Sequence, residues 1–201
     1  MFSPAEIVDI SIDNGIKKIQ KPLLAKLILG FIGGAMISLG YLAYIRVSAS
    51  IPASLASVQA FVGASVFPIG LIVILMAGGE LITGNMMAVS IAFMDKKISF
   101  KDLLINFLTI TLANLVGALF VAYFFGHLVG LTHSGVYLDQ LLSLAHHKTE
   151  ATWLQAIFSG IGCNWFVGLG LWLCYGAKDG AGKIMGIWFP VMEIGRASCR
   201  E

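Results

Sequence analysis

The charged residues of this chain are placed so that long stretches carry none. Residues 27–45 form an uncharged stretch of 19 residues, 47–79 one of 33, 103–138 one of 36 and 151–177 one of 27. A helix that crosses a bilayer needs about 20 mostly apolar residues. Only 12% of the chain is charged, about half the usual fraction in soluble domains. The sequence therefore predicts an all-α polytopic membrane protein and excludes a soluble enzyme, a disordered chain and a disulfide-stabilised secreted domain.

Four complete spans and the start of a fifth are expected from this pattern. The complete spans are predicted at 27–46, 57–94, 104–130 and 153–176, and the fifth is predicted to begin near residue 184. Residues 1–26 place isoleucines among acidic and basic residues. That pattern is typical of an amphipathic helix that lies along the membrane surface, so we interpret 1–26 as an interfacial N-terminal helix of the same domain.

The lysines predict the orientation of the chain. Nine of them lie before the first span, between the second and third, or between the fourth and fifth, whereas the other side holds only Arg46 and Lys148. Because lysine-rich loops face the cytoplasm, we expect a multi-pass protein of the plasma membrane with a cytoplasmic N-terminus. The net charge of +2 is too small to indicate binding to nucleic acid.

The end of the chain differs from what precedes it. Residues 193–201 carry four charged side chains directly after the apolar stretch 184–192, and a charge inside a bilayer costs several kcal/mol. The string also resembles a sequencing adapter translated in frame. We therefore expect a single transmembrane domain over 1–192, incomplete in its fifth span, followed by a non-native tail over 193–201.

The second predicted span is too long for one straight helix and is interrupted near its middle. Small and polar residues gather there within seven positions, namely Gly78, Gly79, Glu80, Thr83 and Gly84. Irregular backbone at membrane depth survives only where it is buried in protein or lines an aqueous cavity. We expect the helix to break here and to resume near Asn85, directing the free N–H groups at its start into that cavity.

Each of these residues also has a structural interpretation. The glycines can permit close helix packing, Thr83 can bond a carbonyl of its own helix, and Glu80 is expected to hold the loop rather than to contact a substrate. The cluster as a whole favours a pore. Phe189-Pro190 in the fifth span is a second candidate break. No catalytic triad, carboxylate pair or metal-ligand set is present in the sequence, so neither an enzyme nor a cofactor or metal site is predicted.

Two blocks of sequence resemble the formate/nitrite transporter family. One is 78–85, and the other runs from Asn164 through 175–179 to 189–192. The resemblance covers essentially all of 1–192. It implies an aquaporin-like helical bundle of six spans in two inverted three-helix repeats, with broken second and fifth spans, one pore in each protomer and assembly as a homopentamer. The second repeat would be incomplete in this chain.

The resemblance also assigns roles to individual residues. It implies that Thr83 is the pore threonine, that Leu71 and Ile82 form an apolar constriction, and that Phe67 neighbours it. Asn164 would be coupled to an outer lysine, for which Lys148 is the candidate. The loop itself would consist of Gly78, Gly79, Glu80, Gly84 and Asn85. The family's central pore histidine has no counterpart before residue 193, so we expect no transport by this chain alone.

The implied function is transport of a small monovalent anion, formate or nitrite, across the lipid bilayer by a channel or proton-coupled mechanism. Two alternatives stay open: a hydrosulfide channel of the same family, and a multispan scaffold whose second span is continuous and has no pore. An aquaporin is disfavoured because no asparagine is followed by proline. An intramembrane enzyme is disfavoured because the spans hold only Glu80 and His127 as candidate catalytic groups.

Overall fold

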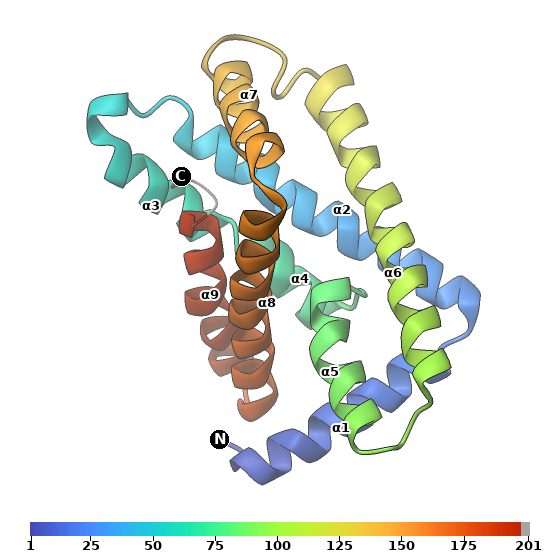
Figure 1. Ribbon diagram of the computed structural model, residues 1–201. Coiled ribbons are helices and arrows are strands. Elements are labelled where there is room, and N and C mark those ends of the chain that lie inside the picture. The colour runs from blue at the N-terminus through green and yellow to red at the C-terminus, as the bar shows by residue number, and fades with distance from the viewer. Residues whose placement is uncertain (198–201) are drawn as a thin grey trace.

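The computed structural model describes residues 1–197, apart from the side chains of residues 147, 196 and 197. Within this range the chain is helical, with a 3-10 turn η1 and a π-helical segment η2 among α-helices. The elements are α1 (Pro4–Gln20), α2 (Leu23–Ser48), η1 (Ala53–Leu55), α3 (Ala56–Val66), α4 (Ile69–Ala77), α5 (Ile82–Met94), α6 (Phe100–Val121), η2 (Ala122–Leu128), α7 (Gly135–Glu150), α8 (Trp153–Gly176) and α9 (Gly180–Ala197). Figure 1 shows their arrangement.

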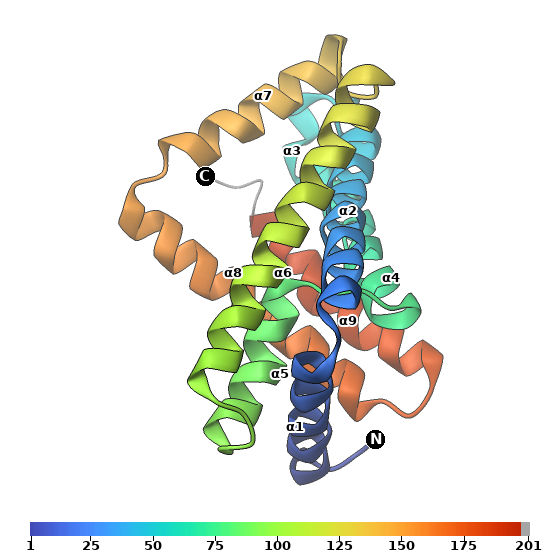
Figure 2. The same cartoon turned by 90° about the vertical axis from the view of Figure 1, so that its right-hand side faces the viewer.

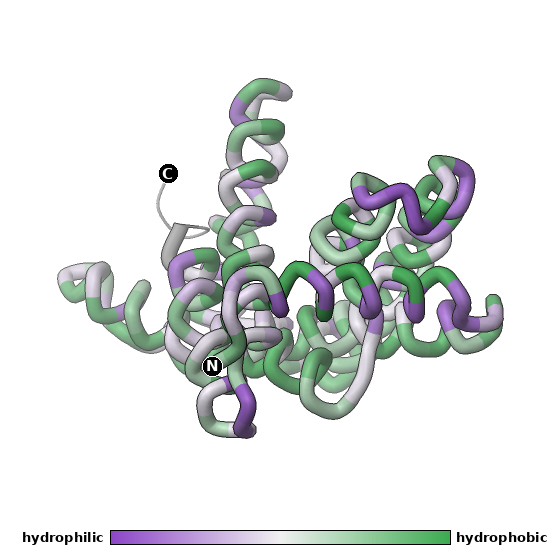
Figure 3. Tube along the Cα trace, turned by 90° about the horizontal axis from the view of Figure 1, so that it is seen from below, coloured by the Kyte–Doolittle hydropathy of each residue, from purple (hydrophilic) through white to green (hydrophobic). Residues whose placement is uncertain are grey.

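Four helical stretches are long and apolar enough to cross a membrane. They are Leu23–Ser48, Ala53–Ala77, Phe100–Leu128 and Trp153–Gly176. Their outward faces are apolar as well: on α6, the side chains of Leu108, Leu112 and Leu119 are 57%, 61% and 58% exposed. Soluble proteins rarely expose such a face, and green dominates the hydropathy-coloured tube of Figure 3. The predicted fold class, an all-α polytopic membrane protein, is confirmed.

Four helix contacts organise the bundle. α2 packs along α6, α9 packs against α8 and α3, and α1 lies across the lower end of α5 in Figures 1 and 2. The contact of α2 with α6 is close because glycines line it. A Cβ added to Gly34 would collide with the Asn114 carbonyl oxygen, and one added to Gly117 would collide with the Phe31 carbonyl oxygen. The backbones of α2 and α6 therefore touch directly, as small residues allow in membrane helices.

The second span is broken, as the sequence predicted. α3, α4 and α5 follow one another from the end of the molecule near α7 to the end where α1 lies (Figure 1). α4 has nine residues and α5 has thirteen, so at 1.5 Å per residue they extend only about 13 Å and about 20 Å. Neither alone crosses a hydrocarbon layer of about 30 Å. α4 reaches that length only together with η1 and α3, in the stretch Ala53–Ala77 that ends at the break. The multispan scaffold with a continuous second span is therefore excluded.

The position at which the helix resumes corrects the sequence-based expectation. α5 begins at Ile82, three residues before the predicted Asn85. Leu81, just before it, is extended (φ −116°, ψ 132°) and offers no side-chain cap. The Ile82 N–H instead donates to the Asn114 side chain of α6. A cap supplied by another helix cannot be recognised from the local sequence, and for this reason the predicted start was wrong.

The expected break at Phe189-Pro190 was also wrong. α9 runs without interruption from Gly180 to Ala197, with Pro190 inside it. Proline removes one backbone hydrogen bond, but packing by neighbouring helices allows it in membrane helices. Here Ile187 and Val191, on either side of Pro190, are 0% and 1% exposed. α9 also crosses the predicted boundary at residue 192, whereas residues 198–201 of the predicted tail lie outside the described residues.

Helix α7 is an element that the charge pattern did not predict. Two contacts with the end of α2 hold it. The Arg46 guanidinium lies 3.8 Å from the centroid of the Tyr137 ring, and Gln140 Nε2 donates to Ser48 Oγ at 2.9 Å. The connection between α6 and α8 is therefore anchored on α2 by polar groups.

Candidate functional site

The break between α4 and α5 is made by a short extended link, residues 78–81. Gly78 ends α4 with φ 99° and ψ 129°, in the region of backbone angles that only glycine adopts readily. A Cβ added to Gly78 would meet nothing within 4 Å. The glycine is therefore required by its backbone angle and not by lack of space. Gly79 and Glu80 follow it in the link, and Leu81 leads into α5.

The side chain of Asn114 on α6 holds this link in place. Its Nδ2 donates to the carbonyl oxygens of Gly30 and Glu80, each at 2.7 Å. Its Oδ1 accepts from the Ile82 N–H at 2.9 Å. The backbone of the link also bonds α2 directly: the Glu80 N–H donates to the Leu29 carbonyl oxygen at 2.9 Å. Backbone groups that the break removes from helical pairing thus find partners on α2 and α6, as buried polar groups must.

The Glu80 side chain forms two ion pairs, one with Lys18 of α1 and one with Lys21, the residue that follows α1. Lys18 Nζ lies 2.7 Å from Glu80 Oε2, and Lys21 Nζ lies 2.9 Å from Glu80 Oε1. Glu80 is 2% exposed. Burial lowers the pKa of the Lys18 ammonium, and the Glu80 carboxylate opposes that shift. Because two ammonium groups face one carboxylate, the region keeps one positive charge in excess.

The start of α5 presents hydrogen-bond donors that have no partner. The Ile82 N–H is taken by Asn114, and the Asn85 N–H donates to the Leu81 carbonyl oxygen at 3.0 Å. Between them, the N–H groups of Thr83 and Gly84 have no acceptor among the described residues. Thr83 Oγ1 is buried and likewise lacks a partner within that range. Two N–H groups and a hydroxyl at the positive end of a helix favour an anion.

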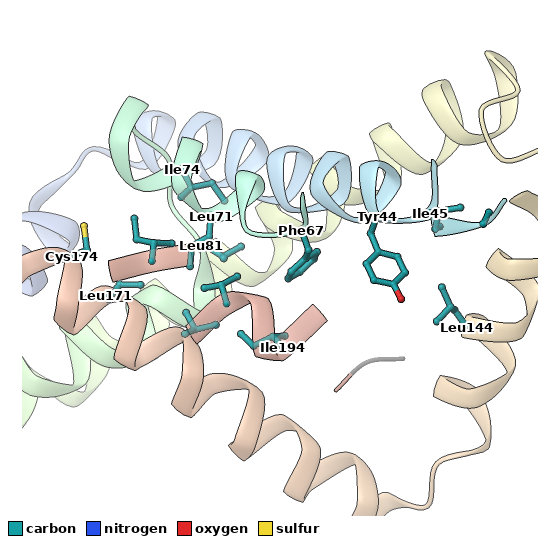
Figure 4. Close-up of a cluster of buried hydrophobic side chains, with 14 residues drawn as sticks. Tyr44, Ile45, Phe67, Leu71, Ile74, Leu81, Leu144, Leu171, Cys174 and Ile194 are labelled. Carbon is teal, nitrogen blue, oxygen red and sulfur yellow. The ribbon is translucent and has the colours of Figure 1, made fainter. Parts of the chain in front are cut away.

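An apolar cluster lies beside these donors. Phe67, Leu71 and Leu81 belong to it, together with Leu171 of α8. Figure 4 shows Leu71 and Leu81 in the same part of the cluster, with Leu171 facing them from α8. The start of α5 adjoins this group, because a Cβ added to Gly84 would lie 3.2 Å from Leu171 Cδ2.

Ile82 is only half-buried and does not belong to the described cluster, whereas Leu81, which sequence reasoning did not single out, does. The constriction that the resemblance implied for Leu71 and Ile82 stays a prediction.

Asn164 and Lys148 are not joined in the structure. Asn164 lines an open groove of about 400 Å³ between α5 and α8, with Met87 and Trp172 among its other walls. Its Oδ1 is buried and has no hydrogen-bond partner among the described residues. Lys148 Nζ lies 5.8 Å from the centroid of the Tyr41 ring, and the described residues include no hydrogen bond between Lys148 and Asn164. Their coupling stays a prediction.

Asn85 is fully buried in α5 and bonds a second amide of α6. Its Nδ2 donates to Asn106 Oδ1 at 2.9 Å. This contact lies eight residues before Asn114 along α6 and joins two side chains, without involving the backbone of the link.

Sequence reasoning missed Asn114, Lys18 and Lys21 as parts of the site. Asn114 stands within the uncharged stretch 103–138, where an amide inside a predicted span is itself a signal of a buried contact. Its partners are 84, 34 and 32 residues away, and no local pattern reveals them. The same holds for the two lysines, which are 62 and 59 residues from Glu80.

The fold and the site together define a membrane transport protein. A span is interrupted inside an apolar bundle, and the interruption presents unpaired donors beside an apolar cluster, an arrangement that transporters use to bind solutes. No group of three or more potential metal ligands is present in the part of the chain that the structure describes.

Comparisons with known proteins identify the family. A family model described as formate/nitrite transporter matches residues 5–197. The chain belongs to the formate/nitrite transporter family. It is 53% identical to the uncharacterized transporter YrhG of Bacillus subtilis over 95% of this chain and 72% of that protein. It is 49% identical to the formate channel BtFdhC of Bacillus thuringiensis over 95% and 73%.

Solved structures share the fold. A chain described as an FNT family ion channel superposes with a TM-score of 0.86, at 24% identity, over 96% of this chain and 77% of its own. A pentameric formate channel with formate bound superposes with a TM-score of 0.77, at 24% identity, over 89% and 70%. These relatives are transporters and channels, not enzymes.

Proposed function

We propose that the protein carries a small monovalent anion, formate or nitrite, through a pore that passes the break of the second span. The observation that carries this proposal is the start of α5, where the N–H groups of Thr83 and Gly84 and the Thr83 hydroxyl are unpaired among the described residues. The similarity to a relative named as a formate channel supports the choice of anion.

The path would select its solute by combining attraction with desolvation. The excess ammonium charge beside Glu80 attracts an anion to one side of the break, and Lys148 and Asn164 would serve the other side. Phe67, Leu71 and Ile82, with Leu81, would exclude a hydrated ion, because an unpaired charge among apolar side chains is expensive. The N–H groups and the Thr83 hydroxyl would replace the water lost by the anion.

Assembly and placement in the cell are part of the proposal. The shared fold with a pentameric formate channel supports a homopentamer with one pore in each protomer. The exposed apolar faces of the spans would contact lipid or a neighbouring protomer. The lysine distribution supports insertion in the plasma membrane with the N-terminus and α1 in the cytoplasm.

The experiment measures uptake of formate and nitrite into proteoliposomes. The protein measured is an extended chain, in which the part of BtFdhC that follows the matched region continues residues 1–192 of this chain. We expect uptake by the extended chain. The extended chain then carries Thr83→Val, with Thr111→Val as control. Thr111 is an exposed threonine of α6, so both variants lose one hydroxyl and keep a β-branched side chain.

A hydrogen bond to a charged group contributes about 1.5–3 kcal/mol, and each 1.4 kcal/mol changes binding tenfold. Thr83→Val should therefore lower uptake at sub-saturating anion by at least about tenfold, whereas Thr111→Val should leave it unchanged. Equal uptake by both variants would refute the assignment of the pore to Thr83.

A further inference from the structure

We propose that Asn114 is a positioning residue of the pore: it caps α5 from a neighbouring helix and so decides which N–H groups are left for the anion. This inference rests on the proposed function. The Asn114 side chain hydrogen-bonds backbone groups of α2, of the link and of the first residue of α5, through three bonds of 2.7–2.9 Å. It would therefore act on the anion through the position of Thr83 and Gly84.

The local sequence cannot supply this cap. A helix normally begins after a Ser, Thr, Asp or Asn whose side chain accepts an N–H of the first turn. The residue in that position here is Leu81, and no side-chain cap is formed by it. Asn114 Oδ1 takes over this role by accepting the Ile82 N–H. With the first N–H occupied, the second and third, those of Thr83 and Gly84, remain as the unpaired donors.

The two donor bonds of Asn114 fix the link against α2. Nδ2 bridges the carbonyl oxygens of Gly30 on α2 and Glu80 in the link. α2 has no side chain at Gly33, which lets the Glu80 carbonyl oxygen approach its backbone: a Cβ on Gly33 would collide with that oxygen. One amide therefore joins α2, the link and α5, and the backbone just before Thr83 is held from both sides.

Asn106 provides a matched control on the same helix. It is 1% exposed, and Asn114 is 8% exposed. Asn106 also bonds α5, but only through the Asn85 side chain, at 2.9 Å. A substitution at Asn106 thus removes a buried amide contact between α6 and α5 without touching the backbone of the link.

The experiment compares Asn114→Leu and Asn106→Leu in the extended chain. Both variants are measured for melting temperature in detergent, for the anion concentration that half-saturates uptake, and for hydrogen exchange of the Ile82 amide. We expect both substitutions to lower the melting temperature. Only Asn114→Leu should raise the half-saturating concentration, by at least tenfold, and accelerate exchange at Ile82 by at least tenfold. Asn114→Gln keeps the amide on a longer side chain and should shift both quantities less, in the same direction.

The outcomes separate the possible failures. Equal half-saturation and equal Ile82 exchange in the two leucine variants would overturn the proposal, since Asn114 would then be an ordinary packing contact. If Asn114→Leu does not fold, Asn114→Gln decides by the same two measurements. If the unsubstituted extended chain takes up no anion, the proposed function fails and the role of Asn114 in the pore fails with it. Ile82 exchange then still reports whether Asn114 caps α5.

Discussion

Removal of both lysines that face Glu80 should release α1 from the broken span. The Glu80 side chain is 3% exposed, and those of Lys18 and Lys21 are 14% and 33% exposed. Loss of the partner of a buried charge lowers stability by about 3–5 kcal/mol. We therefore expect Lys18→Met combined with Lys21→Met to lower the free energy that holds α1 in place by that amount. Each single variant leaves Glu80 with one lysine and should cost much less.

The two single variants should lower the free energy that holds α1 by different amounts. Lys21 is the more exposed lysine, and water screens its ion pair, so Lys21→Met should cost about 1 kcal/mol or less. Lys18→Met should cost more, because its ammonium is more deeply buried. The double variant should exceed the sum of the two, since only there is the carboxylate left without a partner.

Hydrogen exchange of the α1 amides measures this release. A loss of 3–5 kcal/mol corresponds to opening that is about 100-fold to 4,000-fold more frequent, at 1.4 kcal/mol per tenfold. Lys17→Met is the control, because Lys17 is an exposed lysine of the same helix. If the Lys18 and Lys21 substitutions accelerate α1 amide exchange only slightly and additively, no more than Lys17→Met does, the view that the Glu80 ion pairs hold α1 is refuted.

Two further predictions concern the glycines that shape the break. Gly33→Ala should lower the melting temperature in detergent, because the new Cβ would press on the Glu80 carbonyl oxygen, an overpacking cost of about 1–3 kcal/mol. Gly160→Ala is its control on α8: nothing lies within 4 Å of that Cβ, and the stability should be equal or higher by up to about 1 kcal/mol. Gly78→Ala has open space around it, but its φ of 99° and ψ of 129° are strained for any residue with a Cβ. This strain alone should lower the stability by about 1–3 kcal/mol, and an unchanged melting temperature would contradict the role of its backbone angle.

Much of the architecture follows from the sequence without the structure. The charge-free stretch 151–177 predicted a span at 153–176, and α8 occupies those residues. The glycines and Glu80 near the middle of the second span predicted a break, and α4 ends at Ala77. These features are local: the absence of charge decides whether a segment enters lipid, and poor helix formers decide where its hydrogen bonding fails.

Only the tertiary structure decided what happens at each interruption. α5 resumes at Ile82 because an acceptor arrives from Asn114 on another helix. α9 continues through Pro190, where its neighbours Ile187 and Val191 are packed against the bundle. Glu80 acquires two lysine partners from the N-terminal part of the chain, Lys18 on α1 and Lys21 just after it. Buried polar groups must be paired, but any nearby helix can provide the partner, so the identity of that partner depends on the packing of the whole chain.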